Sequence, residues 1–355
     1  MSAQAISAVD TPFKSNGASH PEGLILDRCT QEQAFDLFYT WAVQEQWNPS
    51  VKGQDIRDLY HKADPEGFFY GRIADKQAPT KTEIVSIVSL IRYGKDQAWL
   101  GFYIVLPRHR GKGYGMATFQ KALEHAGHDR QSIGLDGVLA QVENYKKSGF
   151  TNVAWRNERR HGSAKDLVEN LERDLAEKVA RGGVPGLVHL SDDLVDWDQV
   201  QALEQRYAGL KRPEFIKEWA QFHTFNPELH RFGVAVLSTD GTVDEKSGKP
   251  KILGFGCVRP AETSYRVGPL YASTPEVAKL LLVKLGVEVV QAERQSPYHV
   301  PLQFDVDVPT SNEEAVKLFD GLDWKDTFPS LRMWRGKIPE HDVNGIFAVA
   351  TLEVG

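Results

Sequence analysis

The spacing of apolar residues in the first part of the chain predicts a helix followed by a β-hairpin. Residues 30–47 carry apolar side chains at helical intervals, and Thr30 with Gln33 forms the pattern of a capping box at the start. Residues 82–93 are rich in isoleucine and valine, and residues 98–106 are nearly continuously apolar. Turn-forming residues separate these two segments, so we expect them to pair as antiparallel strands.

The rest of the chain repeats one order of elements. After the hairpin, the pattern predicts a helix (114–126), a strand (133–138), a helix ending at Gly149 and a strand (153–159). In the second half it predicts strands at 232–238, 251–259, 264–272 and 302–308, and helices that begin near residues 273 and 312. Because two strands, a helix, a strand and a helix occur twice, we interpret the chain as an internal duplication of one α/β unit.

A segment with a different pattern separates the two repeats. Leucine or valine recurs every four residues from Leu167 to Val179 among charged residues, which is typical of an amphipathic helix. Gly182 and Gly183 are expected to end it. The expected divisions of the chain are a disordered tail (1–20), a first domain (21–162), a linker helix (163–184) and a second domain (185–355).

Composition narrows the class of protein. The 355 residues include 42 basic and 48 acidic side chains, a net charge of −6 that argues against a general nucleic-acid binder. Two cysteines and eleven scattered histidines give neither a disulfide framework nor the spacing of a metal site. No apolar stretch approaches the length of a membrane helix, and the first residues do not resemble a secretory signal. We therefore expect a cytoplasmic protein without a metal, and the oligomeric state stays open.

The segment from Arg110 to Gly115 carries the chemistry. Glycines alternate with other residues between a predicted strand and a predicted helix, so the backbone can approach a ligand closely and its amides can point at an anion. The dinucleotide fingerprint fails because Met116 stands where its third glycine should be, and the phosphate loop of nucleotide hydrolases fails because Gly113 follows Lys112. The segment therefore predicts a pyrophosphate site of another kind.

These residues resemble the signature of the GNAT superfamily of acyl-CoA-dependent N-acetyltransferases. A Val105-Leu106-Pro107 turn precedes Arg110-x-x-Gly113-x-Gly115, and Tyr145 stands four residues before Gly149-Phe150. A narrower likeness, to the YitH/HolE-like acetyltransferases, rests on the runs Trp47-Asn48-Pro49, Gly134-Leu135-Asp136-Gly137-Val138, Val267-Gly268-Pro269-Leu270-Tyr271-Ala272, Asp307-Val308-Pro309 and Arg332-Met333-Trp334. The likeness implies two tandem GNAT-type domains, each a mixed, mostly antiparallel sheet flanked by helices.

The resemblance also implies acetyl-CoA as co-substrate and a set of residues that bind it. Backbone groups near Ile104 and Val105 would pair with the pantetheine arm. The pyrophosphate would lie on Arg110, Gly111, Lys112, Gly113, Tyr114 and Gly115, with Asn144 as a further contact.

Catalytic and acceptor residues follow from the same likeness. Tyr145 is expected to protonate the leaving thiolate, although an ordinary aromatic on an amphipathic helix is the alternative. Asp136, the nearest acid on the next strand, is the candidate general base, with a buried structural aspartate as the alternative. Trp47 and Asn48 are expected to border the acceptor pocket, and core packing is the alternative for Trp47.

The second half departs from the signature. Ser273-Thr274-Pro275 stands where the glycine-rich segment should recur, and Lys317 stands where the tyrosine should be. We therefore expect a degenerate second copy that binds no acetyl-CoA and lines the acceptor pocket. The expected reaction is direct transfer of acetyl to a primary amine, preferably of a small molecule. The alternatives are a non-catalytic acyl-CoA-binding sensor or scaffold and a protein-lysine acetyltransferase.

Overall fold

The computed structural model describes residues 21–74, 81–127, 129–293, 296 and 298–355. Its strands are β1 (Ile25–Arg28), β2 (Phe68–Ala74), β3 (Thr82–Tyr93), β4 (Gln97–Val105), β5 (Ser132–Val138), β6 (Asn152–Ser163), β7 (Leu187–His189), β8 (Phe232–Leu237), β9 (Ile252–Pro260), β10 (Tyr265–Ala272), β11 (Gln303–Pro309), β12 (Lys325–Gly336) and β13 (Ile346–Ala348). Its α-helices are α1 (Gln31–Gln44), α2 (His61–Ala63), α3 (Tyr114–Ala126), α4 (Val142–Lys147), α5 (Ala164–Asp166), α6 (Arg173–Ala180), α7 (Trp197–Ala208), α8 (Pro213–Thr224), α9 (Pro275–Ala292) and α10 (Glu313–Gly321).

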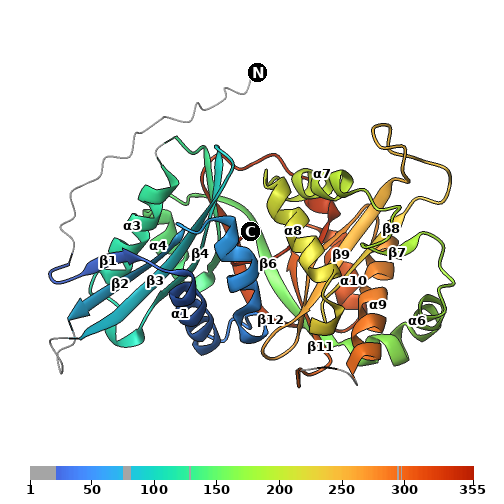
Figure 1. Cartoon of the computed structure of the whole chain (residues 1–355), viewed down its shortest axis with the longest axis horizontal. Helices are drawn as coiled ribbons and strands as arrows, with labels where there is room; N and C mark the ends of the chain where they lie inside the picture. The colour runs from blue at the N-terminus through green and yellow to red at the C-terminus, as the bar shows by residue number, and fades with distance from the viewer. Residues whose placement is uncertain (1–20, 75–80, 128, 294–295, 297) are drawn as a thin grey trace, which may run out of the picture.

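The elements with clear sequence signals form where expected. Helix α1 begins with the predicted capping box: the Gln33 amide donates to the Thr30 hydroxyl at 3.2 Å, and the Thr30 amide donates to the Gln33 side chain at 2.9 Å. The hairpin of β3 and β4 and the helix α3 are likewise confirmed. The repeated order of two strands, a helix, a strand and a helix is present in both halves (Figure 1).

The two halves exchange their last strands. The strands of one continuous sheet follow the order β1-β2-β3-β4-β5-β12-β6-β11-β10-β9-β8-β7, and β13 pairs with β10. Strand β12, the last long strand of the second half, therefore lies between β5 and β6 of the first half. Strand β6 in turn pairs with β11 of the second half. The mixed, mostly antiparallel sheet of the expected fold class is thus present, but it runs through both halves without a break.

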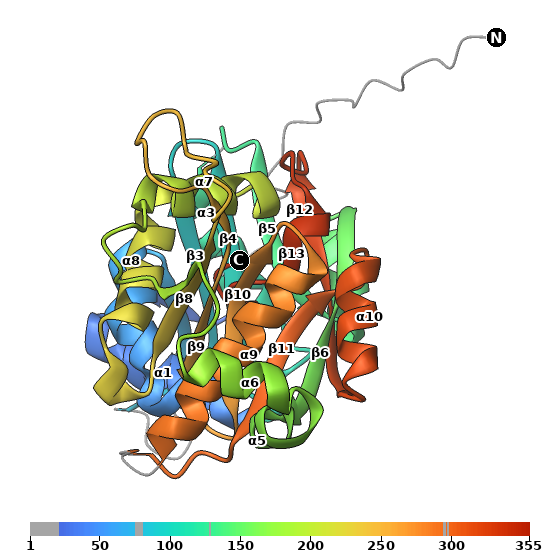
Figure 2. The same cartoon turned by 90° about the vertical axis from the view of Figure 1, so that its right-hand side faces the viewer.

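Three apolar clusters hold the helices on this sheet. One lies between α3, α4 and the first half, and a second lies between α9, α10 and the second half, where Figure 2 shows α6, α9 and α10 in front of the strands. The third is shared: side chains of α1, α7 and α8 pack together with strands of both halves. Trp219 of α8, for example, stacks on Tyr60 at 6.0 Å between ring centroids. The halves therefore share a core as well as a sheet.

Several elements lacked a sequence signal or differ from it. Strands β1, β2, β12 and β13 and helices α7 and α8 were not expected from the pattern. The expected linker helix (163–184) is divided into α5, a π-helical turn (Leu167–Leu171) and α6. Glu172 separates the turn from α6, because it adopts a non-helical backbone conformation (φ −123°, ψ 32°). The predicted disordered tail 1–20 lies outside the described residues. Within the described part of the chain, no helix is both long and apolar enough to cross a membrane.

The strand exchange predicts that neither half folds alone. A fragment of residues 21–181 would leave β5 and β6 without β12, exposing the unpaired amides and carbonyls of two strand edges. We expect this fragment to aggregate or to lack a cooperative thermal transition, and to be rescued as a 1:1 complex when residues 182–355 are co-expressed. Circular dichroism and co-purification measure the two outcomes, and a monomeric 21–181 fragment with a sharp transition would contradict the prediction.

Candidate active site

Strands β4 and β5 pair for only a few residues and then separate. Their parallel register covers Gln97 to Trp99 on β4 and Ser132 to Gly134 on β5. A β-bulge follows on β4, where two residues, Phe102 and Tyr103, stand opposite the single residue Val88 of β3. Phe102 adopts a left-handed conformation (φ 49°) there. A bulge bends its strand, so the end of β4 leaves β5 and a cleft opens between them.

The glycine-rich segment lies at the start of α3. Gly111 and Gly113 have φ values of 77° and 83°, and Gly113 is the N-cap residue, with no side chain bonded to the first amides of the helix. A Cβ atom on Gly115 would lie 2.5 Å from the Tyr103 hydroxyl and from a Val105 methyl group. The backbone therefore needs glycine here, and the free amides of the first helical turn fit an anionic group such as a pyrophosphate.

Basic side chains surround this helix start. Arg110 donates to the Val105 carbonyl at 2.9 Å and pairs with Glu45 at 2.7 Å. Arg108 pairs with Glu83, and the Lys112 ammonium donates to the Arg108 carbonyl at 2.7 Å. The side chains of Arg108 and Arg110 are more than half exposed, so these pairs are weak and can yield to a stronger anion.

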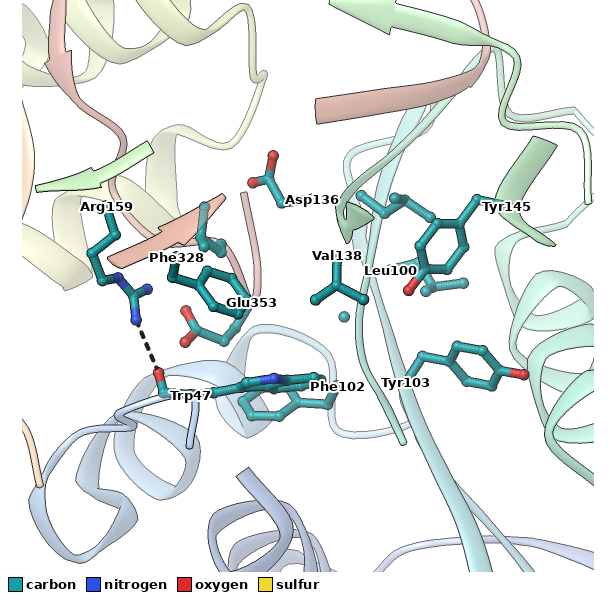
Figure 3. Close-up of a pocket in the computed structure, with 13 residues that line it drawn as sticks. Trp47, Leu100, Phe102, Tyr103, Asp136, Val138, Tyr145, Arg159, Phe328 and Glu353 are labelled. Atoms are coloured by element: carbon teal, nitrogen blue, oxygen red, sulfur yellow. Dashed lines mark hydrogen bonds between the residues drawn. The ribbon is translucent and has the colours of Figure 1, made fainter. Parts of the chain in front are cut away.

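The cleft between β4 and β5 contains a cavity (Figure 3). Its empty space, including the part open to solvent, is about 550 Å³. We call the end beside α4 the inner end, and it is lined by Leu100, Tyr103, Leu135, Val138 and Tyr145.

Tyr145 of α4 reaches the cavity across Gly137. A Cβ atom on Gly137 would lie 2.6 Å from the Tyr145 ring, so the glycine makes room for the aromatic side chain. The hydroxyl has no hydrogen-bond partner among the described residues. Burial raises the pKa of Tyr145 well above its ordinary value, so the group stays protonated and can donate a proton.

The outer end of the cavity is built by both halves. Trp47 follows α1, Arg159 belongs to β6 and Phe328 to β12, while Leu352 and Glu353 belong to the C-terminal segment, which we define as residues 349–355. Figure 3 shows Arg159, Phe328 and Glu353 on the side away from Tyr103 and Tyr145. The second half thus contributes lining residues to this cavity.

Hydrogen bonds hold the C-terminal segment beside β4. Trp99 donates its indole N–H to the Leu352 carbonyl at 3.1 Å, and the Tyr93 hydroxyl donates to the Val354 carbonyl at 2.7 Å. The Glu353 carbonyl lies so close to Gly101 that a Cβ there would approach it to 1.9 Å. The segment therefore forms a fixed wall of the cavity.

A chain of buried charges connects this wall to the sheet. Arg159 makes a two-point contact with Asp307 at 2.8 and 3.0 Å; Arg266 bonds to Asp307 at 3.0 Å and to Glu353 at 2.6 Å. Burial alone would raise the pKa of Asp307, but the guanidinium groups of Arg159 and Arg266 lower it to about 2. The carboxylate is therefore ionised and paired at neutral pH.

Asp136 lies in the cavity wall but is engaged in a buried ion pair. Both of its oxygens accept from Arg332, its partner across β5 and β12, at 3.0 and 2.6 Å, and one also accepts from Asn157 at 2.9 Å. Burial raises the pKa of Asp136 more than the Arg332 guanidinium lowers it. The geometry favours the structural role that the sequence left open, and a role as general base stays a prediction.

The remaining expected site residues have mixed positions. Asn48 does not line the cavity: its amide donates to Ser264 at 2.7 Å and to Asp305 at 2.8 Å, which ties the two halves together. Asn144 lies on the exposed side of α4 and donates to Gln141. Ile104 and Val105 lie on the part of β4 beyond its pairing with β5, and their role in binding the pantetheine arm stays a prediction. Trp47 lines the cavity.

The corresponding cleft in the second half is filled by the chain itself. Strands β10 and β11 pair from Tyr265 to Val267 and then separate, but β13 enters the gap and pairs with Leu270 and Tyr271. The amide of the next residue, Val349, donates to the Asp307 carbonyl at 3.0 Å. The start of α9 also offers fewer free amides to a ligand, because the Thr274 side chain accepts a hydrogen bond from the Val277 amide and Pro275 provides no N–H.

The sequence pattern does not identify the cavity residues that lie far in sequence from the glycine-rich segment. Arg159, Phe328, Leu352 and Glu353 belong to no local motif, and their place in the cavity depends on the strand exchange. The Arg332-Met333-Trp334 run was the one available signal, because it belongs to the strand that pairs with β5.

Comparison with known proteins identifies related domains in both halves. A model of the acetyltransferase (GNAT) family matches residues 27–150, and a model of an acetyltransferase (GNAT) domain matches residues 200–348. Over 325 residues the chain is 29% identical to holothin acyltransferase of Pseudoalteromonas sp. (strain SANK 73390), a match that covers 91% of this chain and 92% of the relative.

Solved structures have a similar fold over most of the chain. A putative acetyltransferase from Pyrococcus horikoshii superposes with a TM-score of 0.65 at 17% identity, covering 94% of this chain and 96% of its own. A tandem GNAT protein from the clavulanic acid biosynthesis pathway superposes with a TM-score of 0.52 at 14% identity, covering 88% and 97%. At these identities the likeness concerns the fold.

The helix start predicts the effect of Gly113→Glu. A glutamate at φ 83° would be strained and would place a negative charge among amides that fit an anion. We expect calorimetry to find one acetyl-CoA site per chain in the unchanged protein and none in the variant. Gly127→Glu is the matched control, because Gly127 ends the same helix at φ 84° with open space around it. Equal affinity in the two variants would contradict the assignment.

The buried charge chain predicts an acid-sensitive fold. Because the folded-state pKa of Asp307 is about 2, below its ordinary 3.8, its contribution to stability is complete above about pH 4 and is lost as pH falls through about 2. We expect Asp307→Asn to lower the free energy of unfolding at neutral pH by about 3–5 kcal/mol, since it leaves two buried arginines short of a partner. Asp323→Asn, at an exposed position, should change it by less than about 0.5 kcal/mol in the same denaturant titration.

Proposed function

Since the chain belongs to the GNAT acyltransferases and carries two of their domains in tandem, we propose that its first half transfers acetyl from acetyl-CoA to the primary amine of a small molecule. The amine attacks directly while both substrates are bound, and no acyl-enzyme forms. The observation that carries the proposal is the cavity in the β4/β5 cleft. The start of α3 lies near one end of it, and the Tyr145 hydroxyl lies in its wall; among the described residues, neither group has a side-chain hydrogen-bond partner.

The proposed mechanism assigns one role to each group of residues around the cavity. Bound acetyl-CoA supplies an acyl group activated as a thioester. The amides at the start of α3, with Arg110 and Lys112, hold the pyrophosphate, and the part of β4 around Ile104 and Val105 runs beside the pantetheine arm. Tyr145 gives its proton to the departing sulfur, which makes the thiol a better leaving group.

A small molecule is favoured over a protein side chain as acceptor. Trp47, Phe328 and Leu352 border the outer end of the cavity and come from three separate elements, so an acceptor there would be in contact with protein on several sides. The Pseudoalteromonas relative, which spans nearly the same length, is named for holothin as its substrate. Both points support a small acceptor for this chain.

The second half serves the site of the first half rather than a site of its own. Strand β13 fills its cleft, and α9 begins with a capped, proline-containing turn, so we propose that it binds no acyl-CoA. Its contribution is the outer wall of the cavity, through Phe328, Leu352 and Glu353.

The proposal predicts that Tyr145→Phe separates turnover from binding. Loss of the hydroxyl removes the proton donor, and general acid catalysis contributes about 10²-fold or more, so kcat should fall by that factor. Acetyl-CoA affinity should stay within about twofold, because the aromatic ring remains. Thiol release and calorimetry measure the two quantities.

Tyr207→Phe provides the matched control, since Tyr207 is a buried tyrosine of α7 away from the cavity. An unchanged kcat in Tyr145→Phe would remove Tyr145 from the mechanism. Tight acetyl-CoA binding by the unchanged protein without thiol release with any amine would favour the sensor instead.

A further inference from the structure

We propose that the acceptor is a flat aromatic amine of low basicity, which enters the cavity uncharged and needs no dedicated base. This inference rests on the proposed function and names the substrate class of the same site. It is carried by two properties of the outer end of the cavity: its aromatic walls and the internal pairing of all its charges.

The aromatic walls come from three elements. Trp47 follows α1, Phe102 lies at the bulge of β4 and Phe328 belongs to β12. In Figure 3 the rings of Trp47 and Phe102 lie below the cavity and that of Phe328 lies above it. Arg159 covers the Phe328 ring with its guanidinium, 5.3 Å from the centroid. Such walls favour a planar, apolar group between them.

The charges at this end are already balanced within the protein. Arg159 is held by Asp307, Glu353 by Arg266, and Asp136 by Arg332. An acceptor with a carboxylate or phosphate would find no spare cation among the described lining residues, and a polyamine would find no spare anion. Burying such a charge without a partner costs several kcal/mol, which disfavours charged acceptors.

The need to remove a proton from the amine also favours an acceptor of low basicity. An alkyl amine with an ordinary pKa of about 10.4 arrives protonated and must lose a proton before it attacks. The described residues that line the cavity include two carboxylates, Asp136 and Glu353, and the oxygens of each already accept hydrogen bonds. Those of Asp136 accept from Arg332 and Asn157, and those of Glu353 accept from Arg266 and Thr351. Protonating either carboxylate would unpair a buried arginine. An amine that is neutral from the start avoids this cost.

The reaction then balances without a base from the protein. The lone pair of the neutral nitrogen forms the C–N bond, the C–S bond breaks, and the sulfur takes the proton of the Tyr145 hydroxyl. Water accepts the surplus proton of the nitrogen and returns one to Tyr145. The products are an amide and a free thiol, and no oxidant or reductant is needed.

The test compares amines that differ in basicity but share one ring system. Full-length protein is assayed for thiol release from acetyl-CoA with an aminoindole, its aminomethyl homologue and a lysine-containing peptide. We expect kcat/KM for the aminoindole to exceed the other two at least tenfold at neutral pH. We also expect it to stay level between about pH 6 and pH 9, whereas an alkyl amine would gain about tenfold per pH unit.

The titratable and charged groups that face the acceptor determine how the pH profile is interpreted. They are Tyr103, Asp136, Tyr145, Arg159 and Glu353, with Arg266, Asp307 and Arg332 behind them. Burial raises the pKa of both tyrosines, to about 12 for Tyr103, and the other groups form ion pairs. A slope in the neutral range therefore reports the proton of the acceptor or of a base that we argue is not used.

Binding supplies a second readout that does not depend on turnover. Trp47→Leu and Phe328→Leu should each weaken binding of the aminoindole about tenfold by calorimetry while acetyl-CoA affinity stays unchanged. Trp197→Leu is the control, because Trp197 of α7 is similarly half-buried but packs on Phe225 outside the cavity.

The outcomes separate this inference from the proposed function. Preference for the aminomethyl compound or the peptide, or an aminoindole rate that rises with pH, would overturn the aromatic, neutral acceptor and leave the acetyltransferase intact. No thiol release with any of the three amines would reject both. Unchanged aminoindole binding in Trp47→Leu and Phe328→Leu would also overturn the inference.

Discussion

The hydrogen-bonded insertion of β12 between β5 and β6 is the constraint on which the rest of the molecule depends. A strand edge exposes a row of amides and carbonyls that must be paired. Here each half supplies a strand that pairs with strands of the other, so one sheet runs through both halves. The cross-strand pair of Asp136 and Arg332 adds a buried charge contact at the same junction.

The outer end of the cavity is a consequence of this exchange. Strand β12 brings Phe328 to the mouth of the β4/β5 cleft, and the chain that follows it returns through the cleft of the second half before it reaches β4. The polar groups that this path buries are satisfied in series, from Arg159 through Asp307 and Arg266 to Glu353. Removing one member of such a network destabilises the fold, because it leaves a buried charge without its partner.

Local signals explain which parts could be predicted from the sequence. The capping box of α1, the hairpin turn before β4 and the glycines before α3 act within a few residues, and each is visible in the printed chain. Tyr145 and Trp47 could be placed near a pocket by family resemblance alone. By contrast, the resemblance predicts that Asn48 borders the acceptor pocket, but its side-chain amide donates to Asp305 at the interface between the halves.

Long-range features carry no such signal. Phe328 lies on a strand that the apolar pattern did not reveal, and Glu353 reaches the cavity only because residues 343–350 thread through the second half. The ion pair of Asp136 with Arg332 joins residues almost two hundred positions apart. No periodicity over a short window can report such a contact.

The strand that fills the second cleft has an evolutionary consequence. Restoring glycines and basic residues ahead of α9 would not restore a nucleotide site, because residues 346–349 already use the backbone positions that a ligand would need. Expelling them would also withdraw Leu352 and Glu353 from the first cavity. Under the proposed function, an acyl-CoA site could therefore be built in the second half only at the expense of the cavity in the first half.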